Sequence, residues 1–318
     1  MPCNQCREKT GDGNMLRITA DIFSGRPNPV ADVTDESEVQ ALLREVDGIR
    51  NLFISDPPAT GELGVRGFSI EPLNDEIGSD FGAEPRLYLP VGPQARGGRA
   101  AEIGERLVTL MERGQAAASR EPAQPLDSTL REYLIPQLSS ATRLSVMDAA
   151  TTTEAEPGPE ETTPAATCTI ELGAFNPGFW NNDSTVRLNN NCYNYASNWR
   201  TNTFAQPGRG CGSMYKAIST AEMTRASLCD GMHHRFNCFP DTEKPRYLVA
   251  LVIAPGIDFH WYRKQKEGFW GHKPGGTAAR NTDNSNNVIF NPETANRGPY
   301  TVFCGYFYGC NSQRQRIR

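Results

Sequence analysis

The sequence predicts an α+β protein of two domains joined by a linker. The chain has 318 residues, more than a single domain usually holds. Apolar residues recur with the period of a strand in some segments and of a helix in others. Residues 146–167 are rich in Thr, Glu, Pro and Ala and carry almost no large apolar side chain, which indicates an extended linker. We therefore expect domains at 1–145 and 168–318.

The first domain mixes strands and helices. The expected strands are 16–23, 65–70 and 86–91, and the expected helices begin near Asp35, at 100–113, and at 126–138 with Asp127 as the cap. The segment 24–29 (SGRPNP) contains Gly and two Pro, which favours a rigid turn, with a recognition loop as the alternative. This domain has no His and no Trp. We expect it to recruit a substrate or a protein partner.

The second domain has a different composition. It holds all four Trp, all four His and 22 of the 28 aromatic residues. Its 17 basic and 10 acidic side chains give +7, which favours an anionic substrate, with a solvated basic tail as the alternative. The expected elements are a strand at 169–172, a helix at 193–201, a helix opened by the capping box at 219–222 and ending near Gly231, a buried strand at 247–253, and a hairpin that carries His260 and His272.

Several classes of protein are set aside. No apolar run approaches the ~20 residues of a membrane span, and the N-terminus lacks a signal-peptide pattern. We expect a soluble protein with no cofactor, no metal and no nucleic-acid partner. The cellular location stays open, because the cysteine density is compatible with secretion.

The chain contains nine cysteines, seven of them in the second domain. Six of those seven would make three disulfides, and local pairs such as Cys229 with Cys238 or Cys304 with Cys310 are plausible. Zinc ligands at Cys229, His233, His234 and Cys238 are the alternative, but only Cys3 and Cys6 show the spacing of a zinc knuckle.

The candidate site centres on Cys192, which follows three asparagines that are good N-cap residues. In the first turn of a helix, the dipole and a nearby imidazole would favour the thiolate, and backbone N–H groups would bind an oxyanion. His260 is the expected general base, and His272 is expected to orient it. If the hairpin turns at Lys266, the two histidines are directly opposed, with Cβ atoms about 4.5–5.5 Å apart.

Other residues complete the hypothesis. Asp283 or Asn281 would replace His272 in the third role, Asn190 and Gln206 would hold the oxyanion, and Trp270 would contact the substrate. The structural alternatives are a buried or disulfide-bonded Cys192, a hydrogen-bonded His260 on a strand, a turn-capping His272 and an aromatic cluster that forms core.

With Cys192, His260 and His272 in this order, residues 185–290 resemble the NlpC-type cysteine peptidases and amidases of the papain-like group. The resemblance implies a helix packed on an antiparallel sheet, a Cys–His–His site and hydrolysis of a peptide or another amide-containing substrate. Two alternatives stay open. One is a non-enzymatic, disulfide-stapled module that binds a glycan or a protein, and the other is a toxin or bacterial effector whose acidic half masks a basic half.

Overall fold

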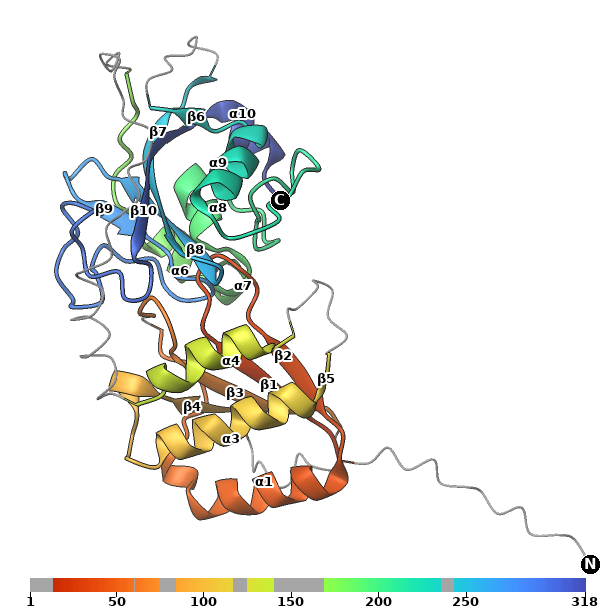
Figure 1. The fold of residues 1–318 in the computed structure, drawn as a ribbon. Coiled ribbons are helices and arrows are strands. Elements are labelled where there is room, and N and C mark those ends of the chain that lie inside the picture. Colours follow the sequence, from red (N-terminus) through yellow and green to blue (C-terminus); the bar gives the residue numbers. More distant parts are fainter. Residues whose placement is uncertain (1–13, 60, 75–83, 117–124, 140–168, 236–242) are drawn as a thin grey trace, which may run out of the picture. The chain divides into compact units, whose positions relative to one another are not determined.

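The computed structural model describes residues 14–59, 61–74, 84–116, 125–139, 169–235 and 243–318 (Figure 1). The chain divides into two compact units. The first comprises residues 1–20, 29–57 and 67–138, and the second comprises 21–28, 58–66 and 139–318. The fold is α+β, as predicted. The expected linker at 146–167 lies outside the described residues.

Two segments of the N-terminal half belong to the second unit. The predicted boundary assigned 21–28 and 58–66 to the first domain, but their polar groups bind residues far along the chain. The N–H of Ser24 donates to Asp258, and the N–H of Leu63 donates to the side chain of Asn284. The order of residues along the chain gives no indication that these two segments pack with the second unit.

The first unit is built on a five-stranded sheet in the order β4-β3-β1-β2-β5. Its strands are β1 (Leu16–Asp21), β2 (Val30–Val33), β3 (Gly67–Pro72), β4 (Leu87–Pro90) and β5 (Gln115–Ala116). In β1 the residues alternate between buried and half-buried positions, as the period of the sequence predicts. The strands β2 and β5 were not predicted, because each is short and one directly follows the prolines of the 24–29 segment.

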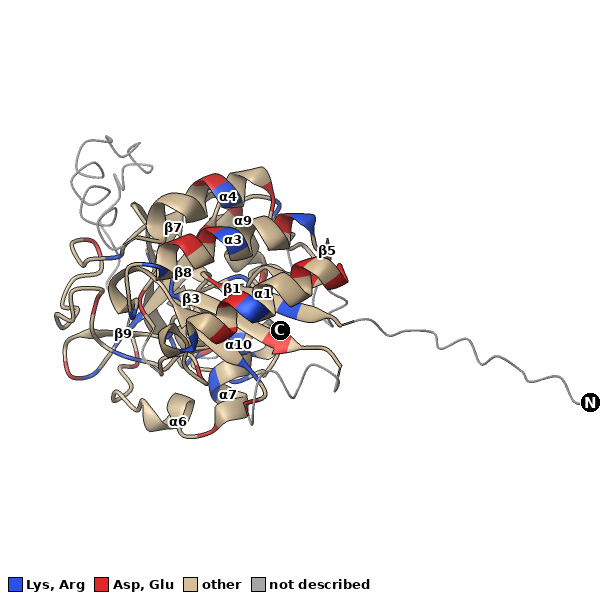
Figure 2. Ribbon diagram, turned by 90° about the horizontal axis from the view of Figure 1, so that it is seen from below, with Lys and Arg blue, Asp and Glu red and all other residues tan. Residues whose placement is uncertain are grey.

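The helices of this unit are α1 (Glu36–Gly48), α3 (Ala100–Arg113) and α4 (Ser128–Leu134), with short 3-10 turns at Arg50–Leu52, Gly92–Gln94 and Ile135–Gln137. The caps Asp35 and Asp127 accept backbone N–H groups, as expected for N-cap residues. The helices α1 and α3 each bury one apolar face. Acidic and basic residues share the helices of this unit (Figure 2). Their ion pairs include Arg106 with Glu45 and Arg113 with Glu38.

The second unit has its own five-stranded sheet in the order β6-β10-β7-β8-β9. Its strands are β6 (His233–His234), β7 (Tyr247–Ala254), β8 (Asp258–Lys264), β9 (Trp270–His272) and β10 (Val302–Gly309). The predicted strand at 247–253 and the hairpin that carries both histidines are confirmed. The predicted strand at 169–172 is wrong, since this segment is irregular and makes its backbone contact at Arg246.

Helices of the second unit are α6 (Gly178–Asn181), α7 (Ser184–Asn189), α8 (Cys192–Ser197), α9 (Thr220–Cys229) and α10 (Asn311–Arg316). The helices α8 and α9 lie on one side of the sheet (Figure 1). Their side chains pack against that face of the sheet in a cluster that we call the helix-side core. It includes Cys192, Tyr193, Ala196, Met223, Val249, Leu251, Ile253, Phe259, Trp261 and Phe307. Among the described residues of both units, no helix has the length and apolar character that crossing a membrane requires.

Candidate functional site

Cys192 lies in the first turn of α8, as the sequence predicted, but the helix spans Cys192–Ser197 and is shorter than the expected 193–201. The side chain of Asn191 caps this helix by accepting from the N–H groups of Tyr193 and Asn194, and the side chain of Asn194 accepts in return from the N–H of Asn191. The run of asparagines therefore produces a capping box, and it fixes where the helix begins.

The surroundings of Cys192 are those of a core thiol. Its side chain is fully buried in the helix-side core, and its Sγ lies 3.9 Å from the carbonyl oxygen of Phe259. Burial, followed by the nearby Asp258 carboxyl, raises the pKa of Cys192 well above its usual range. These surroundings favour the protonated thiol over the thiolate that nucleophilic attack requires.

The two predicted histidines do meet. Nε2 of His260 lies 2.8 Å from Nδ1 of His272, which is the expected ring-to-ring hydrogen bond. The expected register is wrong, however, because His272 is paired with Tyr262 and His260 with Val252. The register is displaced by two positions, which leaves both rings on the same face of the sheet and lets them meet diagonally.

Cys192 and His260 lie on opposite sides of β8. Successive side chains of a strand point to opposite faces, and Phe259 and Trp261 belong to the helix-side core together with Cys192. The ring of His260 instead contacts Tyr262, His272 and Tyr300. The backbone of β8 therefore stands between the thiol and the imidazole that the hydrolase hypothesis pairs.

Both ring nitrogens of each histidine form hydrogen bonds. Nε2 of His272 lies 2.9 Å from the carbonyl oxygen of Thr282, which only accepts, so Nε2 carries the proton and Nδ1 accepts from His260. Nδ1 of His260 then accepts from the hydroxyl of Ser24, 3.0 Å away. The pattern requires two neutral rings. Burial, then the neighbouring His272, lowers the pKa of His260 well below its usual value, and burial, then Arg280, lowers that of His272 to about 3.

A short segment from the start of the chain, Ser24–Arg26, closes this side of the sheet, and we call it the strap. The carboxylate of Asp258 accepts from its three N–H groups at 2.6, 3.2 and 3.0 Å and from the hydroxyl of Tyr300 at 2.5 Å. The carbonyl oxygen of Gly25 accepts from Asn191 Nδ2 and Gln206 Nε2, each at 2.7 Å. The rigid-turn interpretation of 24–29 therefore describes the strap, which is buried rather than presented to a ligand.

The other candidate residues have structural partners. Gln206 donates to the strap, and Asn190 bridges Val186 and Asn202. Trp270 is only 4% exposed and stacks on Tyr306 with ring centroids 5.6 Å apart. The carboxylate of Asp283 caps a turn by accepting from the N–H groups of Ser285, Asn287 and Asn296. Asn281 accepts from Ile289 through its backbone carbonyl.

Three buried polar residues organise this region, namely Ser24, Asp258 and Lys273. Sequence reasoning missed Ser24 and Lys273, and it considered Asp258 only as a less favoured third catalytic residue. The ammonium of Lys273 donates to the carbonyl oxygens of Arg187, Asn190 and Gly275, which uses all three of its protons. None of the three has a local signal, because each partner is remote in sequence or is a backbone group.

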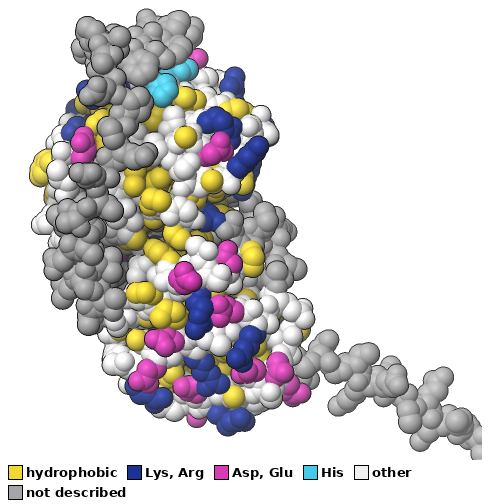
Figure 3. All heavy atoms as spheres, viewed as in Figure 1, with side chains coloured by type: hydrophobic (Ala, Val, Ile, Leu, Met, Phe, Trp, Pro, Cys, Tyr) yellow, Lys and Arg dark blue, Asp and Glu magenta, His cyan; other side chains and the backbone are white. Residues whose placement is uncertain are grey.

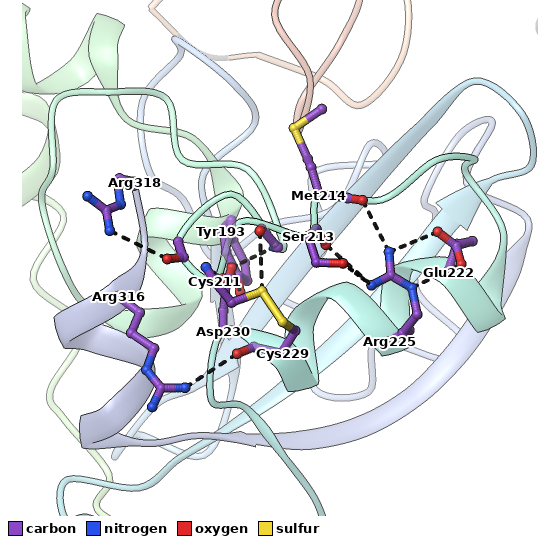
Figure 4. The surroundings of a disulfide bond; sticks show 12 residues. Tyr193, Cys211, Ser213, Met214, Glu222, Arg225, Cys229, Asp230, Arg316 and Arg318 are labelled. Carbon is purple, nitrogen blue, oxygen red and sulfur yellow. Dashed lines mark hydrogen bonds and ion pairs between the residues drawn. A yellow bond between two sulfur atoms is a disulfide. The ribbon is translucent and has the colours of Figure 1, made fainter.

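The expected cysteine pairing is corrected by the disulfide between Cys211 and Cys229 (Figure 4). Cys192, Cys304 and Cys310 are free thiols, so neither Cys229–Cys238 nor Cys304–Cys310 forms and three disulfides cannot form in the second half. The disulfide lies beside Asp230, which accepts from the hydroxyl of Tyr193 at 3.0 Å and from the N–H groups of Gly208 and Cys211. Because Cys229 is bonded to another sulfur, it cannot serve in the zinc set that the sequence suggested.

The fold and the site together define an α+β protein whose second unit is held by one described disulfide and by buried polar networks. No family model and no solved structure matches the chain. It is 48% identical over 132 residues to insoluble matrix shell protein 1 of Ruditapes philippinarum. The matched region covers 42% of this chain and 86% of that protein. The chain belongs to the family of that shell protein.

Proposed function

We propose that the chain is a non-catalytic binding protein of an extracellular matrix and that its second unit is a rigid binding module. The observation that carries the proposal is the placement of Cys192 and His260 on opposite faces of β8, each buried and each hydrogen-bonded. A thiol hydrolase needs these two groups to face a cleft that a carbonyl can enter.

The strap supports the same proposal. An oxyanion site needs donors that are available to the substrate carbonyl. Gln206, the expected donor, already binds the carbonyl oxygen of Gly25 together with Asn191. The chain itself therefore uses the groups that would have stabilised a reaction intermediate.

The relative supports the location. That protein is named an insoluble matrix shell protein, and it shares 132 residues with this chain. A disulfide such as Cys211–Cys229 persists in oxidising compartments and is rare in the cytosol. We infer that this chain is secreted and becomes part of an insoluble matrix.

The contact surface for a matrix component is proposed to be the exposed apolar side chains of the second unit. Phe290 is 69% exposed, and Leu188, Trp199 and Val288 are each more than 40% exposed. Exposed rings stack on the apolar faces of sugars, which favours an insoluble polysaccharide as the matrix component.

Co-sedimentation tests this proposal. The folded full-length chain is mixed with an insoluble β-linked polysaccharide, and the bound fraction is measured for the wild type, Cys192→Ala and Phe290→Ala. We expect Cys192→Ala to bind like the wild type and Phe290→Ala to bind several-fold less. Failure of the folded wild type to sediment with the polysaccharide would refute the proposal.

Thiol hydrolysis is the second candidate, and two observations favour it. Cys192 begins a helix, and His260 is oriented by His272 through the expected hydrogen bond. For this function the strap would have to leave and the thiol would have to reach the other side of β8. Hydrolysis of a peptide or amide panel that is lost in Cys192→Ala and in His260→Ala, both still folded, would establish this candidate and exclude the first.

A further inference from the structure

Three side chains of types that can bind a metal ion converge from separate segments at the β6 edge of the second sheet. His233 lies in β6, Glu243 precedes β7, and Cys310 is the N-cap residue of α10. Their ligand atoms, an imidazole nitrogen, a carboxylate oxygen and Sγ, all lie within 4.8 Å of one another. The sheet register explains part of this arrangement, because His233 pairs with Tyr308, two positions before Cys310.

The carboxylate and the thiol are both held in place. Oε2 of Glu243 accepts from the N–H of Ser312 at 3.1 Å, and Sγ of Cys310 lies 3.7 Å from the carbonyl oxygen of Tyr308. Cys310 is fully buried, whereas His233 and Glu243 are half-buried. Histidine reaches the surface on the face drawn in Figure 3, and since His260 and His272 are buried it belongs to the His233–His234 strand β6. The cluster therefore reaches solvent through His233 and Glu243 and has the sulfur of Cys310 at its buried end.

We propose that His233, Glu243 and Cys310 bind a divalent transition-metal ion of the zinc type, which goes beyond the proposed matrix function. Tetrahedral zinc with bonds of about 2.0–2.3 Å separates its ligand atoms by about 3.4–3.7 Å. Side-chain rotations that move these atoms by about 1 Å close the remaining gap. A water molecule completes the coordination. The Cys310 thiol releases its proton to solvent as the metal–sulfur bond forms.

The ligand set selects zinc over calcium. Calcium takes six to eight oxygen ligands, and this cluster offers one carboxylate. Imidazole and thiolate are the ligands that zinc prefers.

Binding would join three segments that are distant in sequence. The strand β6, the turn before β7 and the start of α10 would share one ion. Because the ligand constellation exists only in the folded chain, bound metal stabilises the fold by mass action, and the C-terminal helix is the element that it secures.

Zinc affinity of the full-length chain, measured by competition with a chromophoric chelator, tests the site. Every variant is made in a Cys3→Ser/Cys6→Ser background, because this removes the CxxC motif as a competing zinc site. Removing an outer hydrogen bond from a zinc ligand already costs about 10–100-fold. We therefore expect Cys310→Ser, His233→Ala and Glu243→Gln each to weaken binding by about 100-fold or more.

Two matched controls separate ligation from general damage. His234 is adjacent to His233, but its ring packs on the ring of Phe307. Cys304 is a free thiol that forms a hydrogen bond with the hydroxyl of Thr220. We expect His234→Ala and Cys304→Ser to retain the affinity of the background. Cobalt should give a thiolate-to-metal charge-transfer band that Cys310→Ser abolishes, and excess calcium should not displace zinc. Unchanged zinc affinity in Glu243→Gln and His233→Ala, a cobalt complex without that band, or displacement by calcium would overturn the proposal.

Discussion

The N–H of Ser24 donates a 2.6 Å hydrogen bond to the carboxylate of Asp258, 234 positions later in the chain. The hydroxyl of Ser24 lies 3.0 Å from Nδ1 of His260. The strap, the first residue of β8 and the histidine pair therefore form one buried network. Residues that resemble a catalytic site in the sequence are used here to hold a remote segment in place.

Removing the carboxylate of Asp258 should destabilise the second unit. In Asp258→Ala the three strap N–H groups and the Tyr300 hydroxyl lose their common acceptor. Stranding buried donors in this way costs about 3–5 kcal/mol. Urea unfolding followed by Trp fluorescence measures the loss, because all four Trp lie in residues 168–318. Tyr300→Phe, which removes one donor and leaves the acceptor, should cost about 1 kcal/mol. Equal effects of the two variants would contradict this account.

Gly25→Ala tests how tightly the strap is enclosed. An added Cβ would lie 2.5 Å from both the ring and the carbonyl oxygen of Phe259. Because Phe259 belongs to the buried strand β8, its backbone cannot move away to make room. We expect a loss of about 1–3 kcal/mol in the unfolding free energy of the second unit. The matched control is Gly173→Ala, whose Cβ meets nothing within 4 Å and which should change stability by less than about 0.5 kcal/mol. A neutral Gly25→Ala would mean that the strap is loosely held.

Stability of the second unit should fall as the pH falls below about 6.5. The pKa values of His260 and His272 are lowered in the folded chain, so the unfolded state binds protons first. The loss runs from the unfolded pKa of about 6.5 toward the folded pKa of about 3 for His272, at about 1.4 kcal/mol per pH unit for each histidine. Asp258, whose pKa burial raises, contributes with the opposite sign and offsets part of this loss. Unfolding free energies from urea titrations across this range measure it, and a flat profile would contradict the neutral pair.

The Cys211–Cys229 disulfide should stabilise the second unit by about 3 kcal/mol, since it closes a loop with a sequence separation of 18. The double variant Cys211→Ser/Cys229→Ser should lower the midpoint of Trp-detected urea unfolding accordingly. Cys304→Ser is the control and should shift the midpoint little, since its thiol is free. No difference between the two variants would indicate that the disulfide contributes nothing to the native state.

Local patterns in the sequence predicted β1, β3, β4, β7, the β8–β9 hairpin and the helices α1, α3, α4, α8 and α9, but not β2, β5, β6, β10, α6, α7 or α10. Caps at Asp35, Asp127 and Asn191 act within three residues, and the strand that begins at Tyr247 follows from its apolar run. The site was only partly predictable. The sequence brought His260 and His272 together through their spacing, but it had no means to show that Phe259 shares the face of Cys192. The strap was missed for a related reason, because its partner Asp258 is remote in sequence and carries no pattern.

The reactivity of Cys192 tests the central claim most directly. The native chain is treated with iodoacetamide near pH 7, and alkylation is followed at each cysteine by peptide mass spectrometry. The buried, hydrogen-bonded thiol with its raised pKa should be labelled far more slowly than half-buried Cys304, and should reach the rate of an ordinary thiol only after unfolding. Rapid labelling of Cys192 in the folded chain, slowed by His260→Ala, would contradict the account and restore the thiol hydrolase.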